Sequence, residues 1–501
     1  MNLSLLIWVP LATALAVALS GGWKQARIIA LSGAVVQLLL AAYFLWAFVE
    51  ARNAGNGSLM LLESSRPWFA PLHINFHIGV DGISMAMVML TAFVVLAGVL
   101  VSWSESYRSR EFFFLLTFLA AGAYGFFISL DLFTLFFFLE LAVIPKFLLI
   151  GIWGSGKRQY SALKLALMLM GGSALVFVGI LAIYFNTRTG QGFHSFDILE
   201  VARQGLPPSV QKFFFPFIFT GFGIFGALFP FHTWVPDGHS SAPTAASMFL
   251  AGISMKLGGY GCLRVATWLM PLAAHDYSGI IVALSVIAIL YGAFATMMQT
   301  DLKYINAYSS VSHCGFVLLG IGMLTQTSLS GAVLQMVSHG LMTALFFASI
   351  GMIYSRTHTR ILSRMGGLLK VMPFISTVFV IAGLCSLGLP GLSGFAAEVT
   401  VLMGSWQNPD TWYRLATILA CCSIVVTAVY ILRAVGQTIM GPVPEKNDFI
   451  LQDASWNEKW AAGILVFGIL IVGVTPFLLT KLTGPGTELI MQQVEKAISI
   501  K

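Results

Sequence analysis

The feature that this sequence most clearly lacks is charge. Only 9% of its 501 residues are charged, whereas 58% are hydrophobic and the mean hydropathy is +0.87. A soluble domain keeps roughly a quarter of its residues charged, so the composition excludes a chain that covers itself with a water-soluble surface. The longest stretches between apolar segments are also too short to hold a separate enzymatic domain; they are 51–80, 186–211, 435–457 and the tail after 481.

Paired metal or redox ligands are lacking as well. The five cysteines lie in apolar stretches with neither paired spacing nor a nearby histidine pattern, and they are Cys262, Cys314, Cys385, Cys421 and Cys422. They predict neither a disulfide framework nor an iron–sulfur or zinc site. No motif resembles a nucleotide loop or a flavin site, so no cofactor is predicted in this chain. The net charge of +7 contains no long basic run and indicates membrane topology rather than nucleic-acid binding.

What the sequence has in abundance is long apolar segments. A bilayer span needs about 20 apolar residues, and fourteen segments meet that length approximately: 3–20, 28–50, 81–103, 111–129, 130–153, 162–185, 212–232, 241–264, 277–299, 304–324, 331–354, 371–405, 412–434 and 458–481. The sequence therefore predicts an all-α integral membrane protein with about fourteen transmembrane helices. Lys and Arg are more numerous in the loops after odd-numbered spans. Because cytoplasmic loops carry this excess, both termini are expected outside the cytoplasm.

Ionisable residues interrupt several of these apolar spans: Glu140, Lys146, Lys256 and Glu398, accompanied by His313 and His339. Placing a charged side chain at the centre of a membrane span costs about 2.5–3.5 kcal/mol even on the scale derived from insertion experiments, which gives the smallest values. The presence of these residues therefore requires an explanation. They could pair only to lock helices together, and either histidine could be a hydrogen-bonded core residue. Their spread over several spans favours a chain of protonatable groups, since histidine titrates near neutrality and passes protons in either direction.

Two spans carry helix-breaking residues. The seventh runs into LFPFHTWVPDGHSSAPT and the twelfth contains SLGLPGLSGF, where proline and glycine forbid a continuous helix. Irregular backbone at membrane depth survives only where it is buried or lines a wet cavity, and paired interruptions are typical of inverted-repeat transporters. Spans 4–8 and 9–13 are therefore predicted to form two inverted five-helix repeats. The expected units are a three-helix segment over 1–110, the repeats over 111–264 and 277–434, and a C-terminal part over 435–501.

Polar residues follow the break in the seventh span. Asp237, His232 and His239 could lie at the cytoplasmic mouth of a proton path, or they could cap the helix that resumes there. The capping role is favoured here.

Several motifs carry a specific resemblance: FFFLELAVIP, PFHTWVPDGHSSAPTAAS, LAGISMKLGGYGCLR, AYSSVSHCGFVLLG, QMVSHGL and GLPGLSGFAAE. They resemble the successive motifs of the antiporter-like subunits of respiratory complex I, which are shared with Mrp-type cation/proton antiporters and membrane-bound hydrogenases. The length, the lack of a long lateral helix and a glutamate at Glu398 resemble subunit M, chain M of NADH-quinone oxidoreductase.

The resemblance implies a role for each buried ionisable group. Glu140 would be the fifth-helix glutamate that pairs with a seventh-helix lysine, and Lys256 would be the central relay lysine. His313 and His339 would carry water-linked proton transfer toward Glu398, the terminal group. The chain would be a proton-translocating subunit of NADH:quinone oxidoreductase, coupled electrostatically to redox chemistry in other subunits.

The resemblance also implies surroundings. FMN, iron–sulfur clusters and quinone are expected in partner subunits, and antiporter-like neighbours are expected on both sides in a bacterial inner membrane. The alternative is a subunit of an Mrp-type sodium/proton antiporter or of a membrane-bound hydrogenase. The partners would distinguish these possibilities, because only complex I has a flavin and iron–sulfur arm that oxidises NADH.

One position departs from the family pattern. The seventh-helix lysine should fall at Phe225, and no lysine lies between Lys212 and Lys256. Lys146 is the candidate replacement, although six residues from Glu140 place it about 9 Å along the helix axis and off the same face. Pro145 can distort that turn. Alternatively, Lys146 extends toward the cytoplasmic interface and has no role in pumping.

Overall fold

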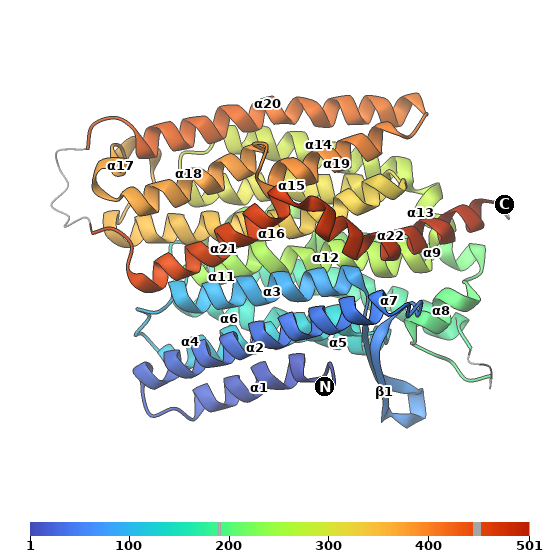
Figure 1. Ribbon diagram of the computed structural model, residues 1–501. Helices are drawn as coiled ribbons and strands as arrows, with labels where there is room; N and C mark the ends of the chain where they lie inside the picture. Colours follow the sequence, from blue (N-terminus) through green and yellow to red (C-terminus); the bar gives the residue numbers. More distant parts are fainter. Residues whose placement is uncertain (189, 191, 444–451, 500–501) are drawn as a thin grey trace.

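The computed structural model describes residues 1–188, 190, 192–443 and 452–499, and its long helices lie side by side along one direction (Figure 1). Within the described residues, nine helical spans are long and apolar enough to cross a membrane. They are α2 (Trp23–Asn53), α3 (Gly82–Val101), α4 (Ser109–Ile128), α5 with α6 (Leu132–Leu141 and Val143–Trp153), α7 (Arg158–Asn186), α14 (Ser278–Met297), α16 (Gln326–Thr357), α20 (Thr411–Ile439) and α21 (Trp456–Val474). The helical membrane class is thus confirmed, while the number fourteen stays a prediction.

Further helices account for the other predicted spans and for parts of the loops. They are α1 (Leu5–Ala18), α8 (Ile198–Gln204), α9 (Pro208–Phe225), α10 (Trp234–Ser241), α11 (Thr244–Phe249), α12 (Met255–Gly261), α13 (Pro271–Asp276), α15 (Leu302–Gly322), α17 (Leu368–Val371), α18 (Pro373–Leu387), α19 (Ser393–Trp406) and α22 (Pro476–Ser499). The predicted loop 435–457 lies partly outside the described residues.

The helix α16 forms the centre of the bundle. It is the most enclosed of the nine spans, with 94% of its apolar window buried, and it packs against α3, α15, α18, α19, α21 and α22. Its first turn is fixed by a capping box in which Thr325 and Ser328 satisfy each other's backbone N–H groups. Outer helices instead expose large apolar side chains, such as Leu167 (71%) and Val425 (69%). Such a surface suits lipid or neighbouring subunits rather than water.

Both predicted helix breaks are confirmed. In the seventh span, α9 ends at Phe225 and α10 begins at Trp234. In the twelfth, α18 ends at Leu387, and Gly388 then adopts a left-handed φ of +77° that favours glycine. A Cβ at Gly394 would lie 2.0 Å from the carbonyl oxygen of Cys385, so only glycine lets α19 start this close to the end of α18. The inverted-repeat arrangement around the two breaks stays a prediction.

Two further departures from regular helix were not predicted. The eighth span contains π-helical turns at Leu250–Ser254 and Cys262–Thr267 on either side of α12. The prediction of one last span over 458–481 was wrong, because α21 ends at Val474 and α22 begins at Pro476. A proline there removes an N–H group that a continuous helix would use.

A β-hairpin, which was not predicted from the sequence, lies within the segment 51–80. Strands β1 (Leu61–Phe69) and β2 (Ile74–Val80) pair in antiparallel fashion with Ser65 opposite His77. Both terminal regions lie on this side of the bundle: Asn2 donates to Ser64 of the hairpin, and Gln493 donates to the carbonyl of Ala202 beside it. Figure 1 shows the hairpin projecting beyond the ends of the helices near the N-terminus.

Candidate functional site

Lys256 lies where two irregular helices meet. It belongs to α12, between the two π-helical turns, and its side chain is only 1% exposed. A Cβ at Gly258 would come within 2.3 Å of the backbone nitrogen of Gly226, so glycine allows α12 to touch the end of α9 directly. The Lys256 Nζ donates to the carbonyl of Ala251 at 2.6 Å and lies 2.6 Å from His339 Nδ1.

Two histidines continue the series from Lys256. His339 on α16 and His313 on α15 have ring centroids 5.4 Å apart. His313 Nδ1 lies 3.1 Å from Glu398 Oε1, and its Nε2 lies 3.0 Å from the Ser386 hydroxyl. Glu398, on α19, is 6% exposed. The structure therefore joins four residues that the sequence singled out, in the spatial order Lys256, His339, His313, Glu398, with the histidines in the reverse of the order expected.

This row can carry protons because each member can both accept and release one. Its side chains come from α12, α15, α16 and α19, two of which begin or end at irregular backbone. Lys, His and Glu are the usual groups of proton relays within membranes. The direct contacts are short enough for a proton to pass along hydrogen bonds. Between the two histidine rings, transfer needs a ring rotation or a bridging water.

Glu140 and Lys146 form a second, separate group. The helix is interrupted at Ala142 between α5 and α6, and Pro145 lies in the first turn of α6. Lys146 is 1% exposed, and its Nζ points toward the Phe225 ring at 5.8 Å from the centroid. The charges of Glu140 and Lys146 act on each other, but no direct ion pair joins them within the described residues.

Phe225, which faces Lys146, is followed by Gly226, and Gly226 shares a small cavity with Lys256. The cavity measures about 10 Å³ and is lined by Gly226, Lys256 and Cys314, among other residues. That volume is close to the minimum that one water needs. Lys146 thus reaches the position at which the family pattern expects a lysine, but it approaches from α6 instead of from α9. Because Lys146 is buried and faces the Phe225 ring, its side chain does not extend to the cytoplasmic interface.

The polar residues after the break in the seventh span do not cap a helix. Asp237 lies inside α10, where Lys164 Nζ donates to it at 2.7 Å and the Tyr304 hydroxyl at 3.4 Å. His239 is fully enclosed against aromatic rings, and neither of its ring nitrogens has a partner within the described structure. His232 is also buried; its ring stacks on Phe229 and meets Tyr291 edge to face. The favoured capping role was therefore wrong for Asp237.

Two buried cations were missed. Lys303, counted as a loop residue, is 5% exposed, and its Nζ donates to the Ala242 carbonyl between α10 and α11. Arg264 is 1% exposed and forms an ion pair with Asp81. A sequence signal existed for Arg264, because the apolar stretch around Lys256 continues past it. Within the described residues, no group of three or more His, Cys, Asp or Glu side chains could hold a metal ion.

With this geometry in view, comparison with known proteins identifies the class. The model of the family described as "NADH:quinone oxidoreductase/Mrp antiporter, TM" matches residues 129–427. The chain belongs to this family of antiporter-like membrane subunits. It is 34% identical to NAD(P)H-quinone oxidoreductase chain 4-2 of Synechocystis sp., over 99% of this chain and 93% of that protein. It is also 33% identical to chain 4 of Gloeobacter violaceus, over 99% and 94%. Chain 4 is the M-type subunit, so the resemblance to subunit M is confirmed.

Solved structures share the fold over nearly the whole length. A chain of respiratory complex I from Thermus thermophilus superposes with a TM-score of 0.88 at 24% identity, covering 98% of this chain and 99% of that one. A chain of the Mrp complex from Dietzia sp. reaches a TM-score of 0.84 at 18% identity, covering 98% of both.

Proposed function

We propose that this chain translocates protons across the membrane as a subunit of NADH:quinone oxidoreductase. The observation that carries the proposal is the row of contacts from Lys256 through His339 and His313 to Glu398. A purely structural set of buried charges would be closed into ion pairs, because an unpaired buried charge is costly. Lys256 instead contacts a carbonyl and a histidine, and Lys146 has no direct partner within the described residues.

In the proposed cycle, Glu140 and Lys146 act as the switch. A charge change in a neighbouring subunit alters the balance between the two, and the altered field across Phe225 changes the proton affinity of Lys256. Lys256 then passes its proton to His339, and the proton continues through His313 to Glu398. The coupling is electrostatic, so this chain needs no redox group; flavin, iron–sulfur clusters and quinone would reside in partner subunits.

The proposed direction of transport follows from the charge distribution. Cytoplasmic uptake would begin near Lys164 and Asp237, because the start of α7 follows an odd-numbered span. Release would occur near Glu398 toward the periplasm. The termini, which lie on the side of the β-hairpin, would be periplasmic, and the chain would sit among other membrane-arm subunits of a bacterial inner membrane.

The relatives support an oxidoreductase over an Mrp-type antiporter. The fold is common to complex I and Mrp structures, so it does not separate the two. The matched relatives that cover nearly the whole chain are NAD(P)H-quinone oxidoreductase chains. An Mrp-type function would make transport depend on sodium and leave it indifferent to NADH.

The test is NADH-driven proton uptake into inverted membrane vesicles carrying Glu140→Gln. The amide keeps the shape of the side chain and removes its charge, so we expect the complex to assemble, as checked on a native gel, while uptake and coupled NADH oxidation collapse. Glu111→Gln, which removes a half-exposed carboxylate paired with Arg108, is the matched control and should pump normally. Normal pumping by assembled Glu140→Gln complex would mean that the buried charges serve only structure.

A further inference from the structure

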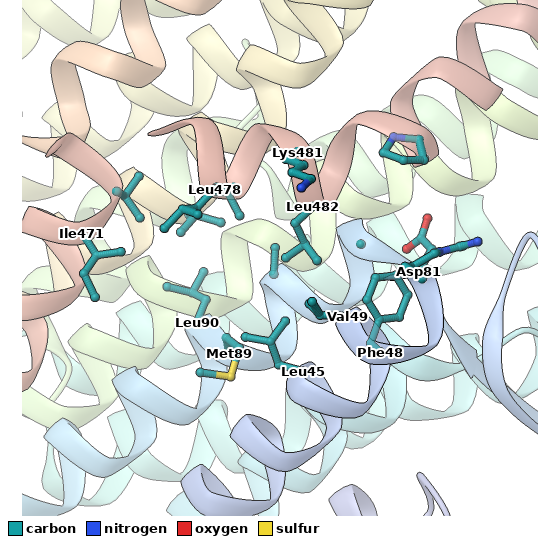
Figure 2. A pocket seen from close by; sticks show the side chains of 18 of the residues that line it. Leu45, Phe48, Val49, Asp81, Met89, Leu90, Ile471, Leu478, Lys481 and Leu482 are labelled. Carbon is teal, nitrogen blue, oxygen red and sulfur yellow. The ribbon is translucent and has the colours of Figure 1, made fainter. Parts of the chain in front are cut away.

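A cavity of about 1050 Å³ lies outside the row of side chains from Lys256 to Glu398. It lies between α2, α3, α16, α21 and α22, and most of its wall is aliphatic or aromatic. Its volume is at the upper limit of the roughly 300–1,000 Å³ of small-molecule sites. Figure 2 shows Ile471 at one end of the cavity and Asp81 with Phe48 at the other, with Lys481 and Leu482 between them.

The packing of α22 against α3 forms one wall of the cavity. A Cβ at Gly82 would lie 1.7 Å from the carbonyl oxygen of Leu482, so α22 rests directly on the first turn of α3. Gly486, one turn further along α22, lies against Asp81 and Ile83. This close contact closes one wall, whereas α21 and the first half of α22 stand away from α2. Several lining side chains there are exposed, including Phe467 (58%) and Leu478 (52%).

Two cations lie among the lining residues of the cavity. Arg52 is at the end of α2, where its guanidinium donates to the carbonyls of Asn56 and Leu59. Lys481 is on α22 and exposed. Neither forms an ion pair with a carboxylate of the described residues. Two carboxylates also line the cavity: Asp81 pairs with Arg264, whereas the exposed Glu488 accepts a hydrogen bond from the neutral amide of Gln492 and keeps its charge.

We propose that this cavity binds one anionic glycerophospholipid. The acyl chains would occupy the apolar slot between α3, α16 and α21, and the phosphate would lie between Arg52 and Lys481. A Lys or Arg side chain near the membrane surface attracts an anionic head group. The shape and the charge point to the same occupant: a long apolar slot that opens on an apolar surface, with Arg52 and Lys481 among its lining residues. The proposal is independent of proton transport by this chain.

The test is native mass spectrometry of the purified complex, depleted of lipid by detergent and then incubated with phosphatidylglycerol or phosphatidylcholine. We expect the wild-type complex to retain one more phosphatidylglycerol than the double variant Arg52→Gln/Lys481→Gln. Retention at this site should fall by about tenfold or more, because two cations near an anionic head group are lost. Lys496→Gln, an exposed cation further along α22, is the control and should retain the lipid.

A second variant tests the slot without touching charge. Leu478→Trp places a bulky ring in the cavity and should remove the same lipid, whereas Leu415→Trp, at an equally exposed position on α20, should not. Cryo-electron microscopy with brominated phosphatidylglycerol should show bromine density beside Leu90 and Ile471. Equal retention of both lipids by the wild type, unchanged retention in either pocket variant, or a helix of another subunit in the cavity would each overturn the proposal.

Discussion

The two sets of buried ionisable residues in this chain are organised in opposite ways. Lys256, His339, His313 and Glu398 are linked from one side chain to the next, with end contacts of 2.6 and 3.1 Å. Glu140 and Lys146 lie close together without a direct ion pair, and Lys146 faces the Phe225 ring. The first set is a series of neighbouring protonatable groups, whereas the second is a pair of charges that make no direct contact.

The difference is informative because closed and open arrangements respond differently to a nearby charge. The row from Lys256 to Glu398 is stabilised by the contacts at its two ends and changes mainly by moving a proton. The buried Lys146 makes no direct ion pair with the half-buried Glu140 within the described residues, so a modest change in the surrounding field can shift the balance between the two charges. From this difference we predict that the row from Lys256 to Glu398 carries the protons, and that the Glu140–Lys146 pair controls the timing of their transfer.

The largest effect should come from breaking the linked row at its start. Lys256→Met keeps the length of the side chain but removes the ammonium group that contacts His339. We expect NADH-driven proton uptake by assembled complex to fall by at least about tenfold, which corresponds to about 1.4 kcal/mol in the barrier. Lys212→Met, which removes a half-exposed lysine paired with Asp276, is the control. Undiminished uptake in Lys256→Met would show that protons bypass the row.

A smaller but more specific effect is expected at the open pair. Lys146→Met removes the buried cation that faces Phe225, so coupled proton uptake should drop strongly while the complex still assembles. The double variant Lys146→Met/Phe225→Lys restores a cation near the same place from α9 instead of α6. We expect it to recover part of the lost uptake in the same vesicle assay.

The single variant Phe225→Lys sharpens this test. It brings two cations together in a buried space, and like charges there oppose each other, so it should pump less well than the double variant. If the double variant pumps no better than Lys146→Met, the position of the cation near Phe225 is not what matters. Lys146 would then act through some other contact.

The sequence predicted the fold where the local rules are strong. Apolar length identified the spans, and the prolines and glycines near Pro236 and Gly388 identified the two broken helices. It also predicted that Lys146, Lys256 and Glu398 are buried, because charge within an apolar span is expensive wherever it occurs, but it missed Lys303 and Arg264. Lys256 and Glu398 were recognisable without any knowledge of their neighbours.

What the sequence could not give depends on contacts between distant segments. The order of His339 before His313 follows from how α15 and α16 pack, and neither helix encodes it alone. The close approach of Gly258 to the end of α9 depends on how these two segments pack. The apolar stretch around Arg264 indicated burial, but its partner Asp81 is far away in the sequence and could not be predicted. The approach of Lys146 to Phe225 likewise required the interruption at Ala142 to be seen in three dimensions.

The smallest predicted effect concerns a pair that is closed but lies outside the membrane-spanning helices. His77 on the β-hairpin lies 2.6 Å from Asp197 and 3.5 Å from Glu63. Burial lowers the pKa of His77, but the hydrogen bond and charge of Asp197 and the charge of Glu63 outweigh this and raise it above 6.5. Protonated His77 is therefore favoured in the folded state. Its contribution to the free energy of unfolding is fully present below about pH 6.5 and is lost as the pH rises through the raised pKa.

Relative to wild type, His77→Gln should lower the unfolding temperature more at pH 5.5 than at pH 8.5, by an amount equivalent to about 1.5–3 kcal/mol at most. Proton uptake should be nearly unchanged, because this closed pair stabilises the hairpin and does not contact the row from Lys256 to Glu398. A loss of pumping without a loss of stability would contradict the distinction between closed and open pairs.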